Sequence, residues 1–124
     1  MTLLRIIGLW GPIIAFMALV YLLAGQEGLP VSGRWLDKLV HAAAYGLFGV
    51  LCLRGFHGGM RPLRLWPSLL AILLTLGYGA LDEWHQAQVP GRHSSLYDWY
   101  ADAAGAAVAL ALWSVGLRPP AGTG

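Results

Sequence analysis

Residues 65–102 read LWPSLLAILLTLGYGALDEWHQAQVPGRHSSLYDWYAD, a stretch that joins a long apolar run to a short polar segment. The polar segment, residues 82–102, holds four of the six acidic residues and two of the four histidines of this 124-residue chain. The chain is 57% hydrophobic and 11% charged, whereas a soluble domain is about 25% charged. Because so little polar surface is available, the composition predicts an integral membrane protein.

Four apolar runs divide the chain, and the run at 65–81 is the third of them. The others cover residues 6–24, 39–53 and about 99–117. A helix needs about 20 residues, at about 1.5 Å each, to cross the hydrocarbon core of a bilayer, and each run reaches that length with its flanking turns. None of the runs alternates in polarity as the strands of a membrane barrel do. We therefore predict an all-α, polytopic membrane protein, a four-transmembrane-helix bundle with short loops.

The expected domain is single and covers residues 1–124, with helices at about 5–24, 37–54, 64–82 and 97–117. The first helix follows Arg5 and has some features of a secretory signal peptide, but its apolar run is longer than a signal core and LLAGQEG is a poor cleavage site. We expect this helix to be retained. Cys52, the single cysteine, lies in an apolar run and is interpreted as a small packed side chain.

The charges predict the orientation of the four helices. Short loops place both termini and the middle loop on one side, and the first and third loops on the other. The terminal side carries five arginines and no acidic residue, while the opposite side carries three basic and all six acidic residues. The positive-inside rule therefore predicts cytoplasmic N and C termini, and the basic pI indicates topology rather than a nucleic-acid partner. Six tryptophans are expected to anchor the helix ends: Trp10, Trp66 and Trp113 on the terminal side, and Trp35, Trp84 and Trp99 on the acidic side.

Polar residues recur at helical spacing on the second expected helix. Asp37, His41 and Tyr45 stand at i, i+4 and i+8 and form one stripe, which reaches about two turns into the membrane. On the fourth helix, Asp98 and Asp102 form a similar line that continues into small residues.

The third helix carries Asp82, Glu83 and Gln86 at the same end. A charged group inside a membrane costs at least about 2.5–3.5 kcal/mol and normally faces a protein interior or a wet cavity. We expect the five carboxylates to be paired with Arg92, Lys38 or His41, or to hold protons. The three helices together predict a polar pocket that opens outward between the second, third and fourth helices.

A structural interpretation of the same residues stays open. Asp37 suits a helix cap, and His41 suits a core histidine bonded to Asp37 or Asp98. The group Asp82, Glu83 and Gln86 suits a solvated helix end, and Arg92 suits a lipid phosphate or a nearby carboxylate. The remaining histidines, His57, His85 and His93, are interpreted as solvated loop residues. Three polar stripes at one depth favour a site over a purely structural ion-pair network.

Three segments resemble the VanZ-like family of small bacterial membrane proteins: DKLVHAAAYGLFG at 37–49, DEWHQAQVPGRHSSLYDW at 82–99 and ADAAGAAVAL at 101–110. The family pattern is D-K-x-x-H-x-x-x-Y, then D-E-x-x-Q with a following P-G-R, then S-x-x-D before a small-residue helix. The matching positions are Asp37, Lys38, His41, Tyr45, Asp82, Glu83, Gln86, Arg92, Ser95, Asp98 and Gly105. Asp102 departs from the pattern, because the family usually has asparagine there.

The resemblance implies a multi-pass protein of the bacterial cytoplasmic (inner) membrane with a role in the cell envelope. It also implies a link to resistance to the glycopeptide antibiotic teicoplanin, and it supplies no reaction. The first functional hypothesis is therefore an outward pocket that recognises a lipid-linked envelope precursor or a lipoglycopeptide. The expected ligand-binding residues are Asp37, Lys38, His41, Tyr45, Asp82, Glu83, Gln86, Arg92, Ser95, Asp98 and Asp102, with Trp35, Trp84 and Trp99 around them.

The second hypothesis is a membrane-embedded hydrolase or transferase acting on a lipid headgroup. His41 with Asp37 or Asp98 would form a base and its orienting partner, and Asp82 or Glu83 would act as the general acid, with Arg92 holding a phosphate. The candidate catalytic residues are thus His41, Asp37, Asp82, Glu83 and Asp98. The sequence has no nucleophile motif, P-loop or HExxH, so it leaves open whether the protein is an enzyme.

Other functions find less support in the sequence. The carboxylates offer oxygens suited to magnesium or calcium, but their spacing matches no defined metal loop, so no metal and no cofactor is predicted. A proton path through His41 and Asp102 is disfavoured because the inner halves of the helices are apolar. Gly46, Gly49 and Gly105 suit internal packing and a homo-oligomer interface equally. The expected partners are the lipid bilayer and the envelope ligand.

Overall fold

The protein is described from a computed structural model, which covers residues 2–24, 34–90 and 96–116. Four α-helices follow one another: α1 (Leu3–Ala24), α2 (Arg34–His57), α3 (Leu65–Ala87) and α4 (Leu96–Gly116). No strand occurs within these ranges. The prediction of an all-α fold with four helices is confirmed.

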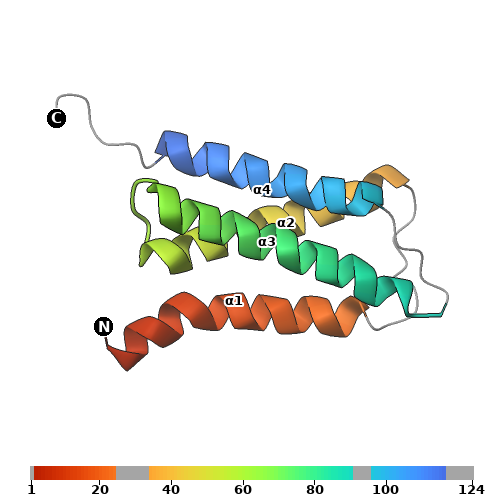
Figure 1. Ribbon diagram of the computed structural model, residues 1–124, viewed down its shortest axis with the longest axis horizontal. Helices are drawn as coiled ribbons and strands as arrows, with labels where there is room; N and C mark the ends of the chain where they lie inside the picture. The colour runs from red at the N-terminus through yellow and green to blue at the C-terminus, as the bar shows by residue number, and fades with distance from the viewer. Residues whose placement is uncertain (1, 25–33, 91–95, 117–124) are drawn as a thin grey trace.

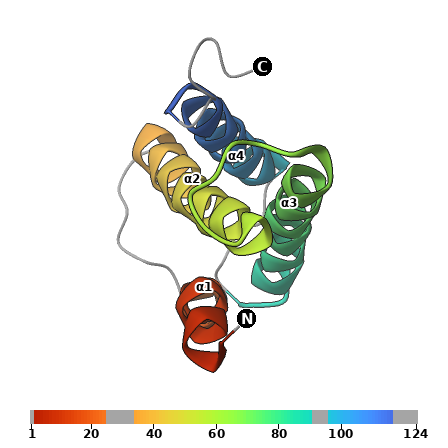
Figure 2. The ribbon, with the colours of Figure 1, turned by 90° about the vertical axis from the view of Figure 1, so that its left-hand side faces the viewer.

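The helices lie side by side and alternate in direction (Figure 1). The start of α1, the turn between α2 and α3, and the last turn of α4 share one end of the bundle, which we call the terminal end. The opposite end, where α1 and α3 finish and α2 and α4 begin, is called the polar end. Seen along the bundle, α2, α3 and α4 pack as a group, and α1 lies against α2 and α3 (Figure 2).

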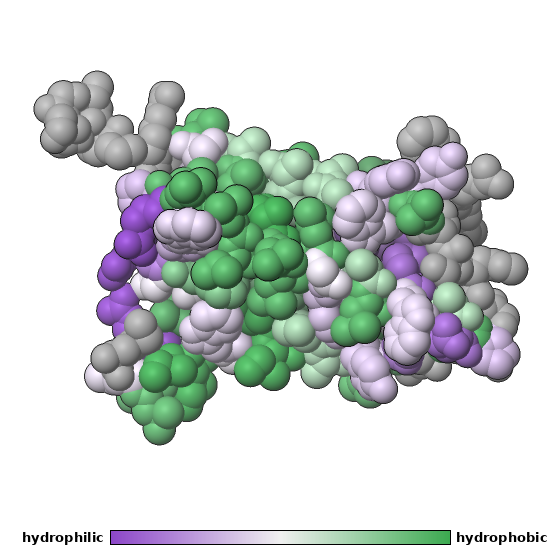
Figure 3. All heavy atoms as spheres, in the orientation of Figure 1, coloured by the Kyte–Doolittle hydropathy of each residue, from purple (hydrophilic) through white to green (hydrophobic). Residues whose placement is uncertain are grey.

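Among the residues that the structure describes, three helical segments are long and apolar enough to cross a membrane, namely Leu3–Leu23, Asp37–His57 and Leu65–Ala87. The fourth helix, α4, has 21 residues, and its two aspartates are buried in the bundle while apolar side chains such as Val108 and Leu112 are exposed. On the face shown in Figure 3, apolar side chains cover the middle of the molecule and polar side chains gather towards both ends; exposed large apolar side chains occur on all four helices. The chain is thus a membrane protein, because an apolar belt of this kind is stable only in lipid.

Glycine and alanine bring α2 and α4 into close contact. A Cβ atom added to Gly105 would collide with the carbonyl oxygen of Ala42 and would lie 2.9 Å from the backbone nitrogen of Gly46. A Cβ at Gly49 would lie 3.4 Å from the Cβ of Ala109. Because backbone atoms cannot rotate aside, only glycine fits at position 105 without a shift of a helix. The glycines predicted at packing positions therefore serve internal packing.

An apolar core lies between the helices at mid-depth. Phe48 is fully buried, stacks on Phe16 of α1 with ring centroids 4.8 Å apart, and packs edge-on against Tyr45. Cys52 is also fully buried, which agrees with its interpretation as a packed side chain. These contacts fix how α2 is rotated about its axis, and so decide which of its residues face α3 and α4 at the polar end.

The helix ends differ from the expected positions. α2 begins three residues before 37 and continues to His57, and α3 continues to Ala87, five residues beyond the expected end at 82. The loop interpretation of His85 is wrong, because His85 lies inside α3 and stacks on Tyr21 with ring centroids 4.6 Å apart. His93 lies outside the described residues.

His57 is buried rather than solvated, with 1% of its surface exposed. Its Nε2 accepts the backbone N–H of Arg64 at 3.1 Å, so the ring proton is on Nδ1, which donates to the carbonyl of Leu53 at 2.8 Å. Two glycines between these partners, Gly58 and Gly59, have φ of +71° and +139° and turn the chain back over the ring. His57 thus stabilises the turn from α2 to α3.

Trp113 does not anchor the terminal end in the headgroup region as expected. Only 4% of its surface is exposed, and its indole N–H donates to the carbonyl of Arg61 at 2.7 Å. Arg5 and Arg54 tie α1 to α2 at the same end, through the carbonyls of Gly58 and Gly8. The terminal end is therefore a hydrogen-bonded structure built around basic residues.

Candidate functional site

The polar end holds nine polar side chains from α2, α3 and α4, which we call the polar cluster. Its members are Asp37, Lys38, His41, Tyr45, Asp82, Glu83, Gln86, Asp98 and Asp102. Four of them, Asp37, Lys38, His41 and Tyr45, belong to α2 and lie on successive turns of the face that contacts α3 and α4. The structure therefore brings together every predicted site residue that lies within the described part of the chain.

The outermost contacts join α2 to α4. The ammonium group of Lys38 bonds to the Oδ1 atom of Asp98 and lies 3.4 Å from Oδ2 of Asp37. The Asp98 side chain is 6% exposed, whereas those of Lys38 and Asp37 are 28% and 41% exposed. Lys38 therefore supplies the positive charge that a nearly buried carboxylate requires.

One turn deeper, His41 contacts Asp102 of α4. Its Nδ1 lies 3.0 Å from Oδ1 of Asp102, and its Nε2 lies 3.9 Å from Oδ1 of Asp37. Asp102 is fully buried, and within the described ranges its Oδ2 atom has no hydrogen-bond partner. Asp37 or Asp98 was expected to be the partner of His41. Asp37 lies within ion-pair distance, whereas Asp98 bonds to Lys38. The shorter contact of His41 is with Asp102, which was not expected as its partner.

A third set of contacts joins α2 to α3. The Tyr45 hydroxyl donates to Oδ2 of Asp82 at 3.2 Å, and the amide of Gln86 lies 3.4 Å from both oxygens of the same carboxylate. Asp82, Glu83 and Gln86 are 6%, 7% and 5% exposed. The interpretation of this group as a solvated helix end is therefore wrong.

Small residues make room for the cluster. A Cβ atom at Gly79 of α3 would lie 3.2 Å from Oδ2 of Asp102 and 3.4 Å from the Tyr45 ring. The same Cβ position is 3.5 Å from the Trp99 ring, whose indole N–H donates to the carbonyl of Leu76 at 3.0 Å. Gly79 thus lets the carboxylate of α4 reach the surface of α3, and Trp99 holds the two helices together beside it.

Other predicted site residues have different positions. Arg92, Ser95 and the side chain of Trp35 lie outside the described residues. Trp84 of α3 is 63% exposed and lines a cavity between α1 and α3. Of the tryptophans expected around a ligand, Trp99 therefore has a structural contact, and Trp84 is mostly exposed.

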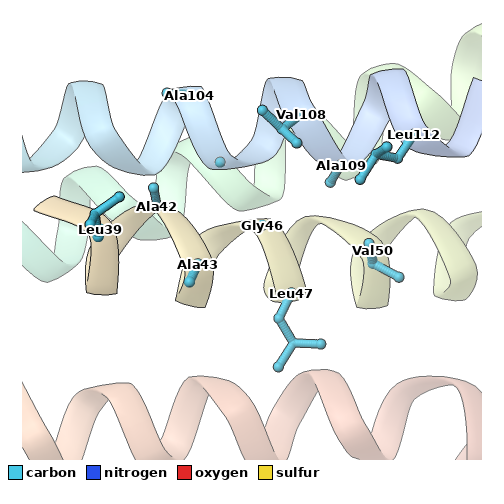
Figure 4. A pocket seen from close by; sticks show the side chains of 11 residues that line it. Leu39, Ala42, Ala43, Gly46, Leu47, Val50, Ala104, Val108, Ala109 and Leu112 are labelled. Carbon is cyan, nitrogen blue, oxygen red and sulfur yellow. The ribbon is translucent and has the colours of Figure 1, made fainter.

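An apolar groove runs along the outside of the α2–α4 contact and encloses about 400 Å³ (Figure 4). It extends on α2 from Leu39 to Val50 and on α4 from Ala104 to Leu112. Its first residue, Leu39, directly follows Lys38, so the groove begins beside the polar cluster. The groove was not predicted from the sequence, although the small residues Ala42, Ala43 and Gly46 are the signal for it.

A smaller cavity of about 170 Å³ lies at the polar end between α1 and α3. Asp82 lines it together with Tyr21, Tyr78 and His85. Asp82 is therefore the member of the polar cluster that borders this cavity.

The cluster is rich in acidic groups. The polar cluster contains five carboxylates, and its basic side chains are Lys38 and His41. Two sets of three side chains bring possible metal-ligand atoms within 4.8 Å of one another: Asp37 with His41 and Asp98, and His41 with Glu83 and Asp102. This arrangement suits the binding of positively charged groups, and the His41–Asp102 pair also suits proton transfer.

Comparison with known proteins agrees with this geometry. The sequence pattern of the VanZ/LLP1 family matches residues 5–117, which include all four helices except the first two residues of α1. No curated protein and no solved structure gives a significant match. Since the family match covers most of the chain, the protein belongs to the VanZ/LLP1 family.

Proposed function

We propose that this VanZ-like membrane protein recognises a lipid-linked cell-envelope molecule or a glycopeptide antibiotic through the polar cluster. The observation that carries the proposal is the burial of four carboxylates between three helices at the polar end, namely Asp82, Glu83, Asp98 and Asp102. A charged side chain within a membrane costs about 2.5–3.5 kcal/mol, and such residues are usually functional. Among the described residues of the polar cluster, acidic groups outnumber basic groups. The excess suits a ligand that brings positive groups, such as amines.

The apolar groove supports the lipid part of the proposal. It covers twelve residues of α2, from Leu39 to Val50, or about 17 Å of helix at about 1.5 Å per residue. In a bilayer an acyl or isoprenoid chain lies along such a groove, parallel to the helices. A lipid whose chain fills the groove would have its headgroup next to Lys38, at the edge of the polar cluster.

In this proposal the polar end faces the outside of the bacterial inner membrane, and both termini are cytoplasmic. The five arginines at the terminal side support this orientation through the positive-inside rule. Lipid-linked envelope molecules and antibiotics would then meet the polar cluster from the outer face of the membrane.

The test is mass spectrometry of lipids and envelope precursors that copurify with the protein. The variant carries Lys38→Met and Asp98→Leu together, because removing both partners leaves no buried charge unpaired. Trp113→Phe, at the terminal end, is the matched control. We expect a species retained by wild type and by the control, and lost from the double variant. Identical sets of molecules in all three samples would contradict the proposal.

A second candidate function is a hydrolase or transferase that acts on a lipid headgroup. The observation that favours it is the 3.0 Å contact between Nδ1 of His41 and the buried Asp102, since a carboxylate that holds one ring nitrogen lets the other accept a proton. Its test is the envelope lipid composition of cells that carry His41→Gln, with His85→Gln as the control. Accumulation of one lipid with His41→Gln alone would support an enzyme, and unchanged composition would count against it.

A further inference from the structure

Three side chains of the polar cluster form a compact donor set drawn from three different helices. His41 of α2, Glu83 of α3 and Asp102 of α4 each offer one ligand atom, and these atoms all lie within 4.8 Å of one another. Two ligands of one ion are at most two bond lengths apart, or about 4–4.8 Å for bonds of about 2.0–2.4 Å. The three atoms therefore fit around a single ion with little movement of the helices.

The contact between His41 and Asp102 has the separation of adjacent metal ligands. Nδ1 of His41 and Oδ1 of Asp102 are 3.0 Å apart. Two ligands at right angles, each about 2.1 Å from an ion, are separated by about 3.0 Å. With Nδ1 on the ion, the Nε2–H group would point towards Oδ1 of Asp37, which lies 3.9 Å away and would orient the ring.

The burial of Asp102 is an independent observation that points to a cation. Asp102 is fully buried, and among the residues the structure describes its Oδ2 atom accepts no hydrogen bond. No lysine or arginine in the same ranges forms an ion pair with it. A buried carboxylate oxygen without a partner is costly, and coordination to an ion removes that cost.

The neighbouring set of possible ligands provides a contrast. Asp37, His41 and Asp98 have the same compact spacing, but the ammonium group of Lys38 already lies between the two carboxylates. Asp37 is also 41% exposed. That set therefore has an ammonium group of the protein's own between its two carboxylates.

We propose that His41, Glu83 and Asp102 bind one divalent transition-metal ion, Zn²⁺ or Mn²⁺ in preference to Mg²⁺ or Ca²⁺. An imidazole nitrogen favours zinc and its neighbours, while two carboxylates extend the choice to manganese. Three protein ligands leave at least one coordination position for water or for an oxygen of a ligand. The sequence spacing alone predicts no metal, because the three ligands come from helices that are far apart along the chain.

The ion would also give the acidic cluster a positive centre. A phosphate or carboxylate of an envelope ligand would then find a partner at the open coordination position. This consequence rests on the proposed function, whereas the metal site itself does not. Metal binding and the copurification of lipids are separate measurements, so the metal site and the proposed ligand recognition can be refuted independently.

The experiment measures metal content and affinity in the purified full-length protein. The protein is stripped with a chelator and titrated with Zn²⁺, Mn²⁺, Mg²⁺ and Ca²⁺, and bound metal is counted by plasma mass spectrometry. We expect one Zn²⁺ or Mn²⁺ per chain in wild type. Asp102→Asn, which keeps the size of the side chain, should weaken binding at least about tenfold, while the control His85→Gln, a histidine of α3 outside the polar cluster, should bind as wild type does.

X-ray absorption at the zinc edge identifies the metal ligands directly in the wild-type protein, without any variant. The expected spectrum has one imidazole, oxygen ligands and no sulfur. The proposal is overturned by wild type that binds no metal, or by a spectrum with sulfur or without imidazole. Unchanged affinity in Asp102→Asn, or equal loss in His85→Gln, would also overturn it.

Discussion

Replacing Gly105 by alanine should separate α2 from α4 and break a contact in the polar cluster. The new Cβ atom would collide with the Ala42 carbonyl and would lie 2.9 Å from the backbone nitrogen of Gly46, whereas ordinary contacts begin at 3.4 Å. The helices must therefore move apart by at least 0.5 Å, the difference between these two distances. His41 is next to Ala42, so its 3.0 Å contact with Asp102 would lengthen to the limit of a hydrogen bond.

The expected loss in the free energy of unfolding is about 1–3 kcal/mol, the usual cost of overpacking. Gly77→Ala is the matched control on α3, because a Cβ atom at Gly77 meets nothing within 4 Å. Alanine is better than glycine in a helix by up to about 1 kcal/mol, so the control should be neutral or stabilising. Unfolding in mixed detergent micelles, followed by circular dichroism, measures both variants. Equal stability of Gly105→Ala and Gly77→Ala would refute the close contact.

Three other substitutions test separate contacts. Tyr45→Phe removes the hydroxyl that donates to Asp82 and should lower the free energy of unfolding by about 1–3 kcal/mol, measured in the same micelles; no change would contradict that hydrogen bond. Lys38→Met alone leaves Asp98 nearly buried without its ammonium partner and should cost about 3–5 kcal/mol, while addition of Asp98→Leu should restore most of it. A double variant no more stable than the single one would argue against this pairing. Trp113→Phe removes one hydrogen bond at the terminal end, so it should cost about 1 kcal/mol in stability and leave the copurified molecules unchanged.

Helix number and the central stripe of the site could be predicted from the sequence because both depend on local periodicity. The apolar runs are long enough to define four helices, and Asp37, His41 and Tyr45 share a face at any rotation of α2. Which carboxylate meets His41 depends on the rotation and depth of α4. The close approach at Gly105 sets both, and it places Asp102 rather than Asp98 opposite the imidazole.

The end of α3 and the burial of His57 could not be predicted from the sequence, because both depend on contacts with distant parts of the chain. Polar residues after an apolar run usually mark a helix end, but Glu83 and Gln86 continue α3 because neighbouring helices bury them. His57 follows an apolar run and precedes two glycines, which is typical of a loop. Its burial depends on the chain returning over it, so that the backbone N–H of Arg64 can reach the ring.

The most direct test of the proposed recognition is native mass spectrometry of the intact protein released from detergent. The central claim predicts one envelope molecule per chain in wild type and in Trp113→Phe. The bound mass should be absent when Lys38→Met and Asp98→Leu are combined in a variant that remains folded. An equal bound mass with the double variant, or no bound envelope molecule in wild type, would contradict the claim that the polar cluster recognises a ligand.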